Sequence, residues 1–120
     1  MARVLALIPD LLFGSRVQSM LSIAGHDVRL LADPAALRAE QASGAVLVVD
    51  LTGEFDGPAL LRELAQEGSV QSLRTLGFYA HVDPAMRARA LAAGFEVVVP
   101  RSRFAREGGE LIERLLAEKR

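Results

Sequence analysis

The sequence predicts an α/β domain in which five strands alternate with five helices and form a parallel sheet covered on both faces. Three observations support this fold class. Short runs rich in Val and Leu alternate with longer segments whose apolar residues recur at helical spacing. The run at 45–49 is apolar at every position, which is typical of a parallel strand buried on both faces. The pair Asp-Pro occurs at 33–34 and again at 83–84, and Asp as N-cap with Pro in the first turn starts a helix.

The first two strand–helix units are predicted from these signals in order. The first strand is expected at 3–8, and the helix after it is ended by Gly25. The apolar face of that helix is expected to contain Leu12, Val17, Met20, Leu21 and Ala24. The second strand is expected at 28–32, and an Asp-Pro start signal then opens a helix that runs to about Ala42.

The other three units follow the same pattern. Their strands are predicted at 45–49, 74–79 and 97–99. Their helices are predicted to start near Gly57, to run from Asp83 to Gly94, and to cover 106–118. The third and fifth helices are expected to bury Leu60, Leu61, Leu64, Leu111, Ile112, Leu115 and Leu116. The whole chain, 1–120, is predicted to be one domain.

Two carboxylates mark the predicted functional edge of the sheet. Right-handed crossovers favour the flavodoxin-like strand order 2-1-3-4-5, in which the first and third strands are neighbours. Asp10 follows the first strand and Asp50 follows the all-apolar third strand. Ligands of open α/β sheets bind at the carboxyl ends of the strands, so the two acids are expected to meet at one crevice. The alternative for each residue is a capping role at a turn or helix start.

Composition limits the classes of function. No apolar run approaches the roughly 20 residues that span a bilayer, and the apolar N-terminus is too short for a secretory signal. The chain contains no Cys and its formal net charge is −1. We therefore expect a cytoplasmic protein without disulfides or cysteine metal sites, and without a general field for nucleic acid. The two histidines, His26 and His81, have no companions at metal-ligand spacing.

A local group of arginines suggests a surface for protein contact. Its members are Arg87, Arg89, Arg101, Arg103 and Arg106. Nucleic-acid surfaces usually interleave aromatic residues with the basic ones, and this group contains none. Arg is enriched at protein interfaces, so the group is interpreted as a protein contact face, with an ordinary solvated surface as the alternative.

The arrangement of these residues resembles the response-regulator receiver domain of bacterial two-component signalling over essentially the whole chain. The resemblance rests on the Asp at the end of the third strand, on the segment 50–57 with its downstream Asp-Gly, and on the segment 79–83 (Tyr-Ala-His-Val-Asp). It implies that Asp50 is the phosphoacceptor, that Tyr79 occupies the switch hydroxyl position, and that Arg101 occupies the position of the fifth-strand cation. It also implies a Mg²⁺ ion, for which Asp10, Asp50 and the Thr52 carbonyl are the candidate ligands.

Three positions depart from the pattern of that family. Pro9 stands where the family has the first of two adjacent acids, so weak Mg²⁺ binding is expected. Tyr79 is a bulky phenol in place of a small Thr or Ser, so the usual inward movement of the hydroxyl is not expected. Arg101 replaces Lys and has a longer, planar head. The resemblance is therefore to an atypical, degenerate variant, a pseudo-receiver.

The function that these residues favour is a signalling module, not an enzyme, that acts by binding a sensor kinase, a downstream regulator or a second copy of the chain. Residual Mg²⁺-dependent phosphorylation at Asp50 is a hypothesis attached to this interpretation. The alternatives are a small metal-dependent phosphatase that uses Asp10 and Asp50, a ligand-binding domain on the same fold, and a purely structural interaction subunit. No dinucleotide or phosphate-binding glycine loop supports a nucleotide enzyme.

Overall fold

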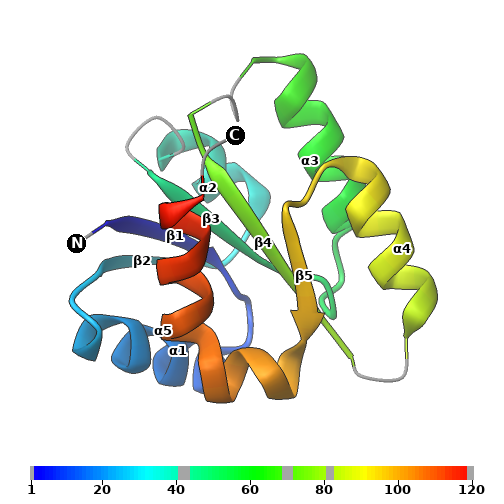
Figure 1. Ribbon diagram of the computed structural model, residues 1–120. Coiled ribbons are helices and arrows are strands. Elements are labelled where there is room, and N and C mark those ends of the chain that lie inside the picture. Colours follow the sequence, from blue (N-terminus) through cyan, green and yellow to red (C-terminus); the bar gives the residue numbers. More distant parts are fainter. Residues whose placement is uncertain (1, 41–43, 69–71, 81–82, 119–120) are drawn as a thin grey trace.

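Five parallel strands form one sheet in the order β2-β1-β3-β4-β5, as predicted (Figure 1). The computed structural model describes residues 2–40, 44–68, 72–80 and 83–118. The strands are β1 (Arg3–Leu7), β2 (Asp27–Leu31), β3 (Val46–Asp50), β4 (Arg74–Tyr79) and β5 (Val97–Pro100). The helices are α1 (Leu11–Ile23), α2 (Pro34–Glu40), α3 (Gly57–Gln66), α4 (Pro84–Ala93) and α5 (Arg101–Ala117).

Helices cover both faces of the sheet and divide the core into two halves. One half lies under α1 and α5 and contains alternate residues of β3, such as Val46 and Val48. The other half lies under α2, α3 and α4 and contains Leu47 and Val49. Successive side chains of a strand point to opposite faces, so a strand covered on both sides must be apolar at every position. This packing explains the uninterrupted apolar run of β3.

An aromatic stack joins the two helices of the first half. The ring centroids of Phe13 on α1 and Phe78 on β4 are 5.2 Å apart in an edge arrangement. Phe78 also stacks on Phe104 of α5, with 5.3 Å between centroids. Such aromatic pairs add about 1 kcal/mol to the burial of the rings. They hold the first turns of α1 and α5 beside the carboxyl ends of the central strands.

The two predicted Asp-Pro capping signals are present, since Asp33 and Asp83 each accept a hydrogen bond from a backbone N–H in the first turn of a helix. Asp10 and Asp56 cap α1 and α3 in the same way. Gly94 ends α4 with φ of 113°, a left-handed conformation that Gly adopts without strain. Within the described residues, no helix is long and apolar enough to cross a membrane.

Three details of the sequence prediction were wrong. Leu12 does not lie on the buried face of α1 but is 83% exposed, because Asp10 caps the helix in a register that turns Phe13, Val17 and Leu21 inward. Ala24, predicted on the same face, is the C-cap of α1 and is exposed. The last helix begins at Arg101 rather than 106, since Pro100 serves as its N-cap and Phe104 already packs in the core. Other strand boundaries differ by one residue, and the predicted end of the second helix at Ala42 lies outside the described residues.

Candidate functional site

An open cleft of about 640 Å³ lies at the carboxyl ends of β1, β2 and β3. Four of the five predicted site residues line it: Asp10, Asp50, Thr52 and Arg101. They come from the loop after β1, the end of β3, the loop after β3 and the start of α5. The strand order explains their meeting, because it places β1 and β3 side by side in parallel register.

Asp50 is the last residue of β3 and is 3% exposed. Asp50 follows Val46 and Val48 at every second position of β3, so it belongs to the face of the sheet that α1 and α5 cover. Its Oδ1 accepts hydrogen bonds from the Thr52 backbone N–H at 2.8 Å and from Thr52 Oγ1 at 2.5 Å. A buried carboxylate requires such donors, since an unpaired one is costly. Thr52 therefore fixes the orientation of Asp50.

Asp10 serves as the N-cap of α1 and also faces a cation. Its Oδ1 accepts hydrogen bonds from the backbone N–H groups of Leu12 at 3.0 Å and Phe13 at 3.1 Å. Its Oδ2 lies 3.4 Å from Nη2 of Arg101. The hydrogen bond from Phe13, with smaller contributions from Leu12 and Arg101, holds the pKa of the Asp10 carboxyl below its usual value. The carboxylate is therefore charged at neutral pH.

Arg101 reaches across the mouth of the cleft from the first turn of α5. Besides its contact with Asp10, its guanidinium carbon lies 4.0 Å from the centroid of the Phe13 ring. A cation over an aromatic face gains about 0.5–1 kcal/mol at an exposed site. The sequence places Arg101 after the fifth strand, and the structure shows that it is a helix residue with two partners on α1 or its cap.

Tyr79 is not brought to the same cleft. It ends β4 and is buried in the half of the core under α2, α3 and α4. Its neighbour Phe78 points to the opposite half. In the described structure Tyr79 is a packed aromatic residue of the core. His81, in the adjoining segment, lies outside the described residues.

The described side chains do not form a ready magnesium site. No group of three or more His, Cys, Asp or Glu among them is arranged to hold a metal ion. One oxygen of Asp10 is taken by the helix cap and the other faces Arg101, while Asp50 Oδ1 is taken by Thr52. Mg²⁺ prefers octahedral oxygen ligands, and a guanidinium within reach of the carboxylate competes with it. The residues present therefore fit this ion poorly.

The sequence analysis missed several features of the cleft. Asp33 and Glu54 also line it, so four carboxylates surround the space. Asp33 was assigned only as a cap, although its position after the second strand was the signal that it lies on this edge. The hydroxyl of Thr52 was given no role, yet it donates to Asp50. Phe13 was not predicted as a site residue, because the sequence around an apolar helix residue does not indicate that a distant arginine packs on its ring.

The members of the predicted arginine group have different surroundings in the structure. Arg89 pairs with Asp56 at 3.1 Å, across α4 and the start of α3. Arg87 and Arg103 line a hollow over β5. Arg106 lines a different hollow, between α1 and α5.

Comparison with solved structures identifies the architecture. The receiver domain of the response regulator TorR superposes with a TM-score of 0.85 at 20% identity, over 97% of each chain. The chain has the receiver-domain fold. The chemotaxis response regulator CheY4 of Vibrio cholerae gives a TM-score of 0.82 at 20% identity, over 96% of this chain and 98% of that one. The receiver domain of a histidine kinase from Syntrophus aciditrophicus gives 0.84 at 17% identity, over 98% and 91%.

The fold of this chain is thus shared, over 96–98% of its length, with these receiver domains and response regulators, at a sequence identity that shows the fold alone. No protein-family model and no curated protein sequence matches the chain. The five-strand order belongs to this fold, and the cleft lies at the carboxyl edge of its sheet. The roles of Asp50, Tyr79 and Arg101 are not carried over by it.

Proposed function

We propose that this chain is an atypical receiver-type signalling module, not an enzyme, that acts by binding another protein. The observation that carries the proposal is the Asp10–Arg101 pair laid over Phe13 at the mouth of the cleft that contains Asp50. This arrangement keeps the phosphoacceptor position and neutralises its surroundings from within the chain.

Asp50 retains the geometry that a carboxylate nucleophile needs. Both hydrogen bonds that the structure gives it go to Oδ1. Oδ2 is consequently the oxygen that can attack a phosphoryl group and form an acyl phosphate. The position of Asp50 at the carboxyl end of the central strand, with the cleft before it, supports the assignment of this residue as the phosphoacceptor position.

The surroundings of Asp50 disfavour an efficient switch. A cation that is to contact the phosphoryl oxygens must be free to turn toward them, but Arg101 is engaged by Asp10 and by Phe13. The Tyr79 ring fills space in the core and cannot repeat the movement of a small hydroxyl residue. We therefore propose that the module signals through a surface that it presents without phosphorylation, to a kinase, a downstream regulator or a second copy.

The experiment is incubation with acetyl phosphate and Mg²⁺, followed by intact-mass measurement, with a beryllofluoride titration in parallel. The proposal expects no added phosphoryl mass in the wild type and no saturable response to beryllofluoride. Full modification of the wild type, absent in Asp50→Asn, would overturn it and restore an ordinary phosphorylated receiver. Steady hydrolysis of a phosphate ester, lost in Asp50→Asn, would indicate a phosphatase instead.

A further inference from the structure

A second hollow region, separate from the acidic cleft, runs between α1 and α5. It consists of a hollow of about 400 Å³ next to Arg101 and one of about 460 Å³ next to Arg106. Arg16 and Ala105 line both, so the two hollows are neighbours. We call this region the α1–α5 groove. Its polar lining residues are Arg16, Arg101, Arg106, Ser15, Ser19 and Ser102.

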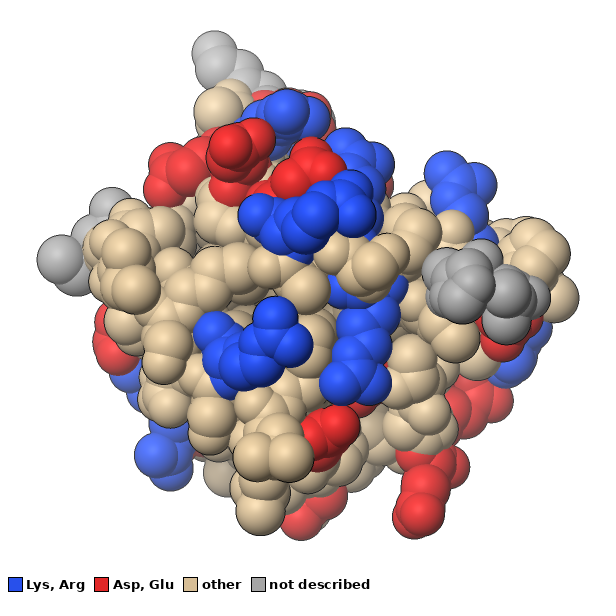
Figure 2. Space-filling view, turned by 90° about the horizontal axis from the view of Figure 1, so that it is seen from below, with Lys and Arg blue, Asp and Glu red and all other residues tan. Residues whose placement is uncertain are grey.

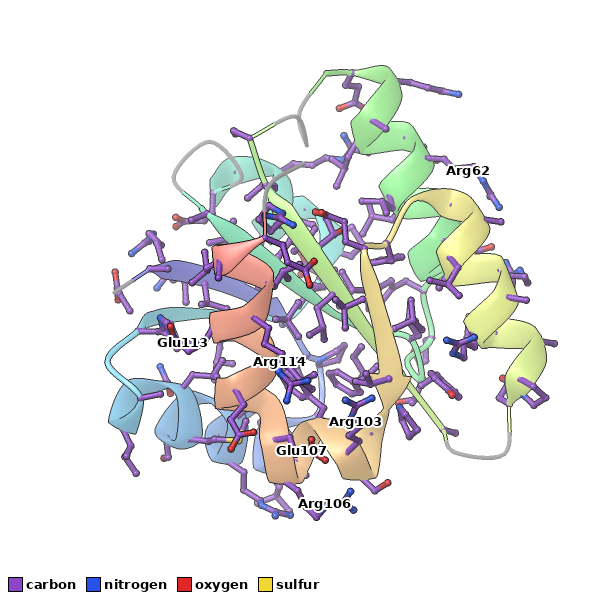
Figure 3. All side chains as sticks on the ribbon, viewed as in Figure 1. Arg62, Arg103, Arg106, Glu107, Glu113 and Arg114 are labelled. Carbon is purple, nitrogen blue, oxygen red and sulfur yellow. The ribbon has the colours of Figure 1, made fainter. Side chains whose placement is uncertain are left out.

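The α1–α5 groove is basic. Within the part of the chain that the structure describes, no acidic residue lines either hollow. Figure 2 shows basic side chains in the middle of the face that is seen from below, and Figure 3 shows Arg106 extending from the lower half of α5 next to Glu107. The Nη2 of Arg106 lies 3.4 Å from a carboxylate oxygen of Glu107, and Arg103 shares the same carboxylate at 3.6 Å.

Arg16 is the central cation of the groove. Its side chain is exposed on α1, and it has no ion pair with the described residues. Arg101 forms the other side, and its guanidinium lies over the Phe13 ring. Its carboxylate partner, Asp10, lines the acidic cleft and not the groove. A guanidinium has five N–H donors, so Arg101 can bind an anion with those that Asp10 does not occupy, although the carboxylate still attracts the same positive charge.

The chemistry of this lining matches a phosphate group. Planar guanidinium groups donate two parallel hydrogen bonds to phosphate oxygens, and these charge-assisted bonds are about twice as strong as neutral ones. Serine hydroxyls supply further donors. The positive end of the α5 dipole adds to the two guanidinium groups, because α5 starts at Arg101 and no side chain caps it.

We propose that the α1–α5 groove binds a phosphate-bearing ligand between Arg16 and Arg101, with Arg106 supporting its far end. This site is distinct from phosphorylation at Asp50, which does not line the groove, and it does not depend on the proposed signalling function. Because Arg101 borders both spaces, the bound anion competes with Asp10 for the same guanidinium.

The test is a titration at constant ionic strength, followed by backbone amide NMR, with inorganic phosphate in one arm and a phosphoserine peptide in the other. A chloride titration and the unphosphorylated peptide are the controls. We expect saturable shifts around Arg16 and Ser102 with phosphate and none with chloride. Saturation by the peptide alone would assign the phosphate to a protein partner, whereas saturation by both would assign it to small phosphorylated ligands as well.

Matched variants make the test specific. Arg16→Gln should weaken binding about tenfold, the value of one charge-assisted contact, while Arg62→Gln, an exposed arginine on α3, should leave it unchanged. Asp10→Asn preserves the helix cap and should strengthen binding several-fold, as it frees Arg101. Equal losses in Arg16→Gln and Arg62→Gln, or no saturable phosphate response in the wild type, would overturn the proposal. Unchanged affinity in Asp10→Asn would overturn the competition for Arg101.

Discussion

Two adjacent glycines in the middle of α5, Gly108 and Gly109, allow a test of how closely this helix must approach α1. Glycine in a helix interior costs about 1 kcal/mol relative to alanine. A Cβ at Gly109 would lie 3.5 Å from the Cβ of Ala24, an ordinary contact. Gly109→Ala should therefore stabilise the protein by nearly the full value, about 1 kcal/mol.

Gly108 meets a different environment. A Cβ there would lie 2.4 Å from Cε of Met20 and 3.3 Å from both Met20 Sδ and a ring carbon of Phe104. Met20 is partly buried and its end can shift, but Phe104 is fully buried and stacked on Phe78. Overpacking of this kind costs about 1–3 kcal/mol, which offsets or exceeds the gain in helix propensity. Gly108→Ala should be neutral or destabilising.

Urea denaturation followed by circular dichroism measures both variants. We expect the midpoint to rise in Gly109→Ala and to stay or fall in Gly108→Ala, without a change in the m-value. Met20→Ala removes the side-chain atoms that lie closest to Gly108. In this background Gly108→Ala should raise the free energy of unfolding, because part of the gain in helix propensity is then realised. If Gly108→Ala stabilises as much as Gly109→Ala, the close packing of α1 on α5 is not a requirement of the fold.

Three further predictions concern the acidic cleft. Because the pKa of Asp10 is lowered in the folded protein, the ionised carboxylate stabilises the fold above pH 3.8, the ordinary aspartate value. This stabilisation is lost as the pH falls from 3.8 through the folded-state pKa. In that pH range the denaturation midpoint of the wild type should fall more steeply than that of Asp10→Asn. Thr52→Val removes one of two donors to Asp50 and should lower the free energy of unfolding by about 1 kcal/mol, whereas Thr52→Ser should not. Arg101→Lys loses the contact of the guanidinium with the Phe13 ring, so the cation is freer to turn. The fraction of chain modified by acetyl phosphate should rise above that of the wild type, and an unchanged fraction would contradict the role given to the Asp10–Arg101 pair.

Much of the fold could be predicted because its signals are local. Apolar runs, helical spacing and Asp-Pro starts each depend on a few neighbouring residues, and they located all ten elements. The rule of right-handed crossovers then yielded the observed strand order. The meeting of Asp10 and Asp50 at one cleft follows from that order alone.

The contacts inside the site depend on packing between distant segments. Asp10 and Arg101 are 91 positions apart in the sequence. They can pair because Phe13 of α1 and Phe104 of α5 both pack on Phe78 of β4, which places the starts of the two helices close together. The burial of Tyr79 away from the cleft depends on which face of β4 it occupies at the strand end. The sequence by itself thus determined the layers, the strand order and the acids at the edge. Only the tertiary structure decided which cation neutralises Asp10 and where the basic groove lies, because side-chain partners across a fold are chosen by packing geometry and not by local propensity.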